Sequence, residues 1–142
     1  VDRLKSFGIP TEVRICSAHR TPAVAEQLAK NAAGEGFGVI IAAAGKAAHL
    51  GGVLAAYTTL PVIGVPMATS VMGGMDSLLS IVQMPKGIPV ATVAVGGGDN
   101  AAYLAAQMLS IKYPILAEKL LAHREQMAAA IEADDRQIQD EV

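Results

Sequence analysis

Ser17, His19 and Arg20 fall within four residues, directly before Thr21 and Pro22. An arginine presents paired donors in one plane, which suits a phosphate, and the amino end of a helix attracts anions as well. An imidazole is the side chain that most readily moves a proton near neutral pH. The segment indicates either a site for a phosphorylated ligand with a proton carrier or a polar turn with an exposed histidine and arginine.

A second candidate segment runs from Gly45 through Lys46 to His49. Glycine and other small residues allow a ligand to approach the backbone closely. The segment therefore suits a loop that surrounds a small group, with His49 at its edge. The alternative is a loop that leads into a helix, with His49 as an ordinary residue of the first turn.

Other patterns are weaker. Gly96, Gly98 and Ala101 match G-x-G-x-x-A, but no strand with an acidic end follows, which argues against a dinucleotide site. Cys16 could pair with a histidine as a nucleophile, yet it lies in an apolar run, where a buried thiol is usual. The three histidines lack the spacing of metal ligands, and His123 is expected on a solvated helix face.

The elements that position these segments follow from the hydrophobic pattern. Three apolar runs do not alternate with polar residues, as in parallel strands that are covered on both faces, and a fourth run does alternate. Helical stretches separate the runs, so the class is α/β with a parallel sheet. The Thr21 hydroxyl is expected to cap the first of these helices, with Pro22 at its first position. The predicted strands are 12–17, 39–44, 61–66 and 90–95, and the predicted helices are 21–34, 49–57, 75–83, 101–110 and a long helix from 114.

Ligands of parallel sheets bind beyond the carboxyl ends of the strands. The turns that follow the four predicted strands, at 17–20, 45–49, 67–74 and 96–100, are therefore where ligand-binding residues are expected. The last helix has apolar residues at helical spacing (Leu116, Leu120, Met127 and Ile131), so it should bury one stripe on its own domain or on a neighbouring subunit.

Composition excludes several classes of protein. The 142 residues are 52% apolar and 17% charged, which is incompatible with disorder and sufficient for one domain, expected over 1–142. A net charge of −2 provides no field for nucleic acid or an anionic membrane. One Cys rules out an internal disulfide framework and fits a reducing compartment such as the cytoplasm. No apolar run reaches the roughly 18 residues of a membrane helix.

The strings SAHRTP at 17–22 and DSLLSIVQMP at 76–85 are long and specific. Together with 47–50, 61–66, 87–95 and 100–102, they resemble class I 5-(carboxyamino)imidazole ribonucleotide mutase, the PurE family of purine biosynthesis, over nearly the whole chain. The resemblance implies a flavodoxin-like three-layer domain, assembled into a homo-octamer. It implies isomerisation of 5-(carboxyamino)imidazole ribonucleotide to the 4-carboxylate through CO2, without metal, nucleotide cofactor or ATP.

The resemblance also assigns roles to the two candidate segments. One histidine would be the catalytic proton carrier, an arginine would bind the substrate at its phosphate, and a serine would hydrogen-bond the substrate or orient the histidine. Small and apolar residues with a second histidine would surround the carboxylate. The catalytic histidine would be His19, the arginine Arg20 and the serine Ser17. The residues around the carboxylate would be Ala18, Ala44, Gly45, His49 and Leu50.

Two departures from the family pattern matter. Nothing in 1–10 supplies the usual first strand and its Gly-Ser-x-Ser-Asp turn, so truncation is expected. That strand belongs between the 12–17 and 39–44 strands, which therefore should not pair, and the chain alone is expected to fold poorly. In addition, Lys46 and Gly51 stand where the family more often has Gly and Pro, which brings a charge near the carboxylate.

Two other functions stay open. The related class II enzyme carboxylates aminoimidazole ribonucleotide with free CO2, although the DSLLSIVQMP string favours class I. A catalytically inactive ribonucleotide-binding or structural homologue is the third hypothesis, because the usual Ser/Asp turn is absent from the sequence.

Overall fold

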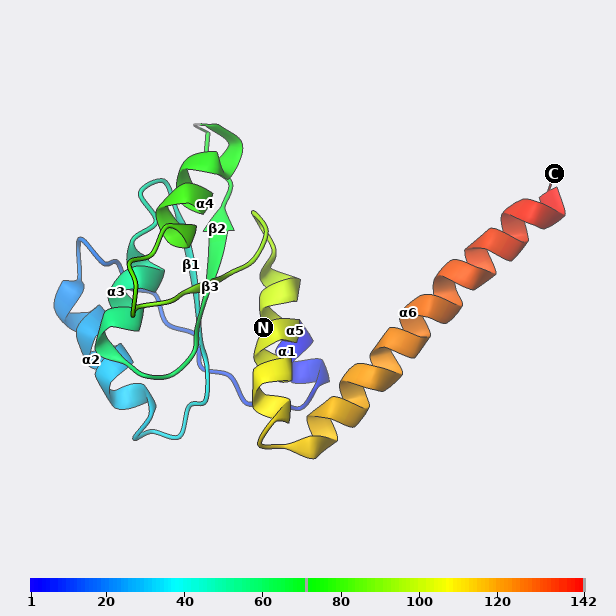
Figure 1. Ribbon diagram of the computed structural model, residues 1–142, viewed down its shortest axis with the longest axis horizontal. Helices are drawn as coiled ribbons and strands as arrows, with labels where there is room; N and C mark the ends of the chain where they lie inside the picture. The colour runs from blue at the N-terminus through cyan, green and yellow to red at the C-terminus, as the bar shows by residue number, and fades with distance from the viewer. Residues whose placement is uncertain (71, 142) are drawn as a thin grey trace.

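A three-stranded parallel sheet lies at the centre of the computed structural model, which describes residues 1–70 and 72–141 (Figure 1). The strands β1 (Ile40–Gly45), β2 (Val62–Met67) and β3 (Ala91–Thr92) lie side by side in that order. β1 and β2 are in register along their whole length, from Ile40 opposite Val62 to Gly45 opposite Met67. The first five residues of β2 are buried, as its continuous apolar sequence predicts for a central strand.

Helices cover both faces of the sheet. One face carries α2, α3 and α4, and the other carries α5 with α1 behind it, while α6 projects away from the body (Figure 1). The helices are α1 (Asp2–Ser6), α2 (Pro22–Ala32), α3 (Leu50–Tyr57), α4 (Met75–Val82), α5 (Gly98–Ser110) and α6 (Pro114–Glu141), with a 3₁₀ turn η1 (Met72–Gly74) before α4.

The core is divided by the sheet, which confirms the three-layer α/β class. On one side, Ala42 of β1 packs with alanines of α2 and with Leu54 of α3. On the other side, Ile63 and Val65 of β2 pack with the alanines of α5 and with Leu4 of α1. Gly64 has no side chain because Ile81 of α4 occupies the space that a Cβ would need. Alanine and glycine thus allow the helices to lie close to the sheet.

The prediction of four strands is wrong for the described residues, since 12–17 forms no strand. Among residues 1–70 and 72–141 no strand pairs with this segment, and the apolar side chains of its alternating pattern face outward: Val13 is 66% and Ile15 99% exposed. An alternating pattern forms a strand only where a neighbouring strand hydrogen-bonds to its backbone N–H and C=O groups. The segment does not pair with β1, as expected.

The predicted strand 90–95 is also shorter, because β3 holds only two residues. The chain beyond β3 nevertheless follows β2. The amide of Val93 donates to the carbonyl of Gly64 at 3.1 Å, and the amide of Gly96 donates to that of Pro66 at 2.8 Å. These bonds bring the 93–97 loop to the carboxyl end of β2, where ligands of parallel sheets bind.

Helix α6 is attached to the body through its first turns. Leu116 and Leu120 are buried with Phe7 and Ala106, and Lys119 donates through Nζ to the carbonyl of Phe7 at 2.8 Å. Further along, Met127 (48% exposed), Ile131 (70%) and Ile138 (62%) face solvent. The expected stripe is therefore buried on its own domain at Leu116 and Leu120, and burial of Met127 and Ile131 on a neighbouring subunit stays a prediction. Over the described residues, no helix is long and apolar enough to cross a membrane.

Candidate functional site

The segment 17–21 forms a closed turn at the start of α2. The carbonyl of Ser17 accepts from the amide of Thr21 at 2.9 Å and from its hydroxyl at 3.1 Å. The amide of Ser17 donates back to Thr21 Oγ1 at 2.8 Å. Thr21 is the N-cap residue with Pro22 at the first helical position, as predicted. The prediction that its hydroxyl caps the helix is wrong, because that hydroxyl bonds back to Ser17.

The side chain of Ser17 orients Arg20. Its Oγ accepts from the amide of Arg20 at 3.2 Å and from Nε of the guanidinium at 3.4 Å. The guanidinium is exposed, so its remaining donors can bind an anion in solvent. These bonds give Ser17 a contact with the arginine that the sequence did not predict, and the two roles expected for it, a bond to the substrate or orientation of His19, stay predictions.

His19 and His49 are brought into direct contact, although thirty residues separate them. Nε2 of His19 lies 2.8 Å from Nδ1 of His49, and the rings meet edge to face with centroids 4.9 Å apart. One nitrogen must carry the proton and the other must accept it, so the pair shares one proton in this bond. Both rings are exposed. The pair can take up or release a proton toward a bound ligand while one ring holds the other in place.

The β1–α3 loop positions His49. Gly45 ends β1, and a Cβ on it would lie 2.8 Å from Thr69 Cγ2, so a side chain does not fit there. His49 is the N-cap residue of α3. Leu50, the first residue of the helix, packs against the cluster that contains Ala42. The loop is thus fixed at both ends by packing, with His49 outside.

Helix α4 supports this edge of the sheet. The buried Ser77 hydroxyl lies 2.8 Å from the carbonyl oxygens of both Met67, at the end of β2, and Gly74. Ser80 bonds to the carbonyl of Asp76 at 2.7 Å and lies 3.5 Å from that of Lys46. Through these hydroxyls α4 is tied to the loops that follow β1 and β2. The sequence string DSLLSIVQMP contains both serines but gives no sign of this use.

The structure brings together the two segments that the sequence singled out. In the turn before α2, the predicted site residues Ser17 and Ala18 are half-buried, and His19 and Arg20 are exposed. At the end of β1 and in the loop that follows, His49 is exposed and the other predicted site residues are half-buried: Ala44, Gly45 and Leu50. The direct His19–His49 bond was not predicted. Both residues follow apolar runs, which was the available signal, but nothing in the sequence pairs them.

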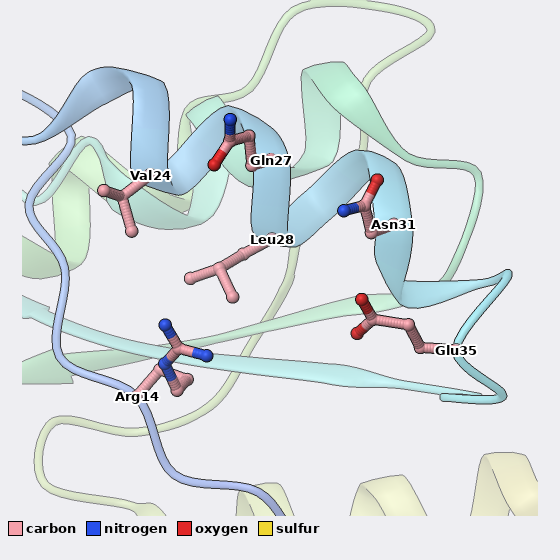
Figure 2. Close-up of a pocket in the computed structure, with 6 residues that line it drawn as sticks. All are labelled: Arg14, Val24, Gln27, Leu28, Asn31 and Glu35. Atoms are coloured by element: carbon pink, nitrogen blue, oxygen red, sulfur yellow. The ribbon is translucent and has the colours of Figure 1, made fainter.

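Two hollows lie elsewhere, and none of the eight residues lines either. One, of about 170 Å³, lies between the extended segment and α2, where Arg14 faces Val24, Leu28 and other residues of the helix (Figure 2). The other, of about 820 Å³, includes Pro61 and Val62 at the amino end of β2, opposite to the histidine pair.

Within residues 1–70 and 72–141, no three His, Cys, Asp or Glu side chains are grouped to hold a metal ion. The half-buried thiol of Cys16 packs against the α2–α3 core.

Known proteins match this chain over most of its length. Residues 1–130 match the family model described as AIR carboxylase. The N5-carboxyaminoimidazole ribonucleotide mutase of Pyrococcus horikoshii is 52% identical over 137 residues, covering 96% of this chain and 77% of the relative. The mutase of Mycobacterium tuberculosis is 52% identical over 136 residues, covering 96% and 78%.

A solved structure, the PurE of Treponema denticola, superposes with a TM-score of 0.84 at 29% identity, covering 96% of this chain and 85% of that one. The fold, the edge that holds the histidine pair and these matches define an α/β enzyme of the PurE type. The chain belongs to the AIR carboxylase family.

Proposed function

We propose that this chain isomerises 5-(carboxyamino)imidazole ribonucleotide to the 4-carboxylate of aminoimidazole ribonucleotide, in purine biosynthesis. The observation that carries the proposal is the exposed His19–His49 pair beside Arg20, at the carboxyl edge of a PurE-type sheet. The relatives that match over most of the chain are mutases of this substrate. A ribonucleotide needs an anion site for its phosphate, and the isomerisation needs a proton carrier.

His19 is the proton carrier. The bond between the exocyclic nitrogen and the carboxylate carbon breaks and releases CO2, and the electron pair stays on the nitrogen, which takes a proton from His19. The ring carbon then attacks CO2, and the proton that this carbon loses returns to His19. The His19 ring thus gives up one proton and takes one back, and there is no net oxidation. His49 holds the ring in position through the 2.8 Å bond.

Binding is divided between two groups of residues. Arg20, oriented by Ser17, binds the phosphate, because a guanidinium matches the geometry of phosphate oxygens. The second group of residues surrounds the carboxylate and keeps released CO2 beside the ring. Small side chains suit this purpose because they let the backbone approach the carboxylate. That group consists of Ala18, Ala44, Gly45, His49 and Leu50.

The assembly we infer is a homo-octamer that works in the cytoplasm. Exposed apolar side chains support association, since Met75, Leu79 and Val82 form a stripe on α4, and Met127 and Ile131 are exposed on α6. Light scattering on the purified protein should give a mass eight times 14.6 kDa. A monomeric mass would contradict the octamer without bearing on the chemistry.

The assay compares two substrate pairs. The protein is supplied with 5-(carboxyamino)imidazole ribonucleotide in one reaction and with aminoimidazole ribonucleotide plus bicarbonate in the other, and formation of the 4-carboxylate is followed. Turnover of the first confirms the mutase. Turnover of the second alone supports the free-CO2 carboxylase, which the family's name also describes. Binding without turnover of either supports an inactive homologue.

A further inference from the structure

Lys46 holds a backbone conformation that is uncommon for a lysine. Its φ is 59°, in the left-handed region that glycine adopts freely and other residues seldom do. It directly follows Gly45, the last residue of β1, on the loop that leads to His49. A residue kept in a strained conformation at the edge of a site suggests a function for its side chain.

The neighbours of Lys46 fix its backbone and leave its side chain exposed. Gly45 lies against Thr69, where no additional atom fits, and the hydroxyl of Ser80 lies 3.5 Å from the Lys46 carbonyl. Among the residues that the structure describes, no ion pair involves the Lys46 ammonium. The charge is therefore free to meet an anion at the carboxyl edge of the sheet.

We propose that the Lys46 ammonium binds the carboxylate of the substrate and of the product, as a specificity-determining residue. This inference rests on the proposed function. The loop that carries Lys46 also carries Gly45 and His49, which we place around the carboxylate, whereas Arg20 on the other segment serves the phosphate. A compact charge on a flexible four-carbon stem can follow the carboxylate in both of its positions, on nitrogen and on carbon.

The charge should affect binding more than the rate of the bound complex. Substrate and product both carry the carboxylate as an anion, but the CO2 between them is neutral. Lys46 therefore stabilises the two bound ground states at least as much as the states that lead through CO2. Its removal should raise KM without lowering kcat.

The test measures binding of two ribonucleotides by calorimetry, one with the 4-carboxylate and aminoimidazole ribonucleotide without it. Lys46→Met should weaken binding of the carboxylated ligand about three- to fivefold, a modest effect because an exposed ion pair is screened by solvent. Binding of the other ligand should not change, and Lys46→Arg should retain most of the affinity.

Lys86→Met is the matched control, since it removes the same charge beside Gly87, which lines the hollow at the amino end of β2. It should leave both affinities unchanged. Lys46→Gly removes the charge while relaxing the backbone, so it gives the same comparison if the methionine variant folds poorly.

Equal losses for both ligands would overturn the proposal by placing Lys46 on the phosphate, and so would no loss for either. Because the measurement needs no turnover, it is independent of the isomerase assay. A wild-type protein that binds both ligands but does not isomerise would refute the proposed function and leave the Lys46 comparison valid. A wild-type protein that binds neither would refute both.

Discussion

His19 and His123 each form a short hydrogen bond to another aromatic side chain, but the first bond is exposed and the second is half-buried. Nε2 of His19 lies 2.8 Å from His49 at the exposed carboxyl edge of the sheet. Nε2 of His123 lies 2.6 Å from the hydroxyl of Tyr103, half-buried between α5 and α6. The first pair meets edge to face, at 81°, and the second is stacked, at 20°.

The second pair is enclosed by its neighbours. Phe7, directly after α1, contacts both rings edge-on, with centroids 5.8 Å from that of Tyr103 and 6.3 Å from that of His123. The guanidinium of Arg3 lies over the Tyr103 ring at 5.2 Å. These contacts join α1, α5 and α6. The expectation that His123 lies on a solvated face is therefore wrong.

A hydrogen-bonded histidine is suited to chemistry when solvent, and hence a ligand, can reach it. His19 and His49 belong to loops and keep exposed faces, whereas His123 is surrounded by helices that its bond to Tyr103 helps to hold together. We expect substitutions in the first pair to reduce activity without unfolding the protein, and substitutions in the second to do the reverse.

The largest effect is expected for His19→Asn. Loss of a proton carrier typically costs about 10²–10⁴-fold in rate, or roughly 3–5 kcal/mol of barrier. The side chain is exposed, so the melting temperature should stay close to that of the wild type. Steady-state kinetics and thermal denaturation check both expectations, and a rate near that of the wild type would remove His19 from the mechanism.

Arg20→Ala should chiefly weaken substrate binding. A charge-assisted contact to phosphate contributes about 1.5–3 kcal/mol, which corresponds to roughly 10–150-fold in affinity. Arg20→Lys should recover part of it, because an ammonium lacks the planar pair of donors. Ser17→Ala serves as a companion, since it frees the guanidinium from the Oγ that orients it. An unchanged KM in Arg20→Ala would show that this residue does not hold the phosphate.

His49→Asn tests whether the pair acts as a unit. Removal of one hydrogen bond between rings should cost about 1–1.5 kcal/mol of barrier, or roughly tenfold in rate. If His49 acts through His19, the double variant with His19→Asn should be no slower than His19→Asn alone. Independent, multiplying losses would instead show that His49 acts through its own contact with the carboxylate and not through His19.

Much of the site's location could be predicted from local sequence, because strand ends and helix starts are marked by residue type. The apolar run that became β1 marked 45–49 as a turn at the carboxyl end of a strand, and the residue types of 17–22 marked the start of α2, although the strand predicted before that turn is absent among the described residues. The contact between His19 and His49 could not be predicted, because it depends on how two loops thirty residues apart are positioned by packing.

Local patterns failed where a partner decides the outcome. The alternation in 12–17 satisfies a strand pattern, yet among residues 1–70 and 72–141 no strand pairs with it, and Ile15 is 99% exposed. The Thr21 hydroxyl had two competing bonds within reach, and the one to Ser17 was formed. His123 resembled a surface residue since helical spacing does not reveal that Tyr103 approaches from another helix.

The smallest effect is expected for Tyr103→Phe, which removes the hydroxyl and preserves the ring. The loss leaves Nε2 of His123 without its partner and should lower the free energy of unfolding by about 0.5–1.5 kcal/mol, or the melting temperature by about 2–4 °C. His123→Asn removes the ring contacts with Phe7 and Tyr103 as well as the bond, so it should cost more, and the double variant should cost little more than His123→Asn alone. The rate per folded molecule should stay within about twofold in all three. A large fall in that rate, with stability unchanged, would reverse the roles assigned to the two pairs.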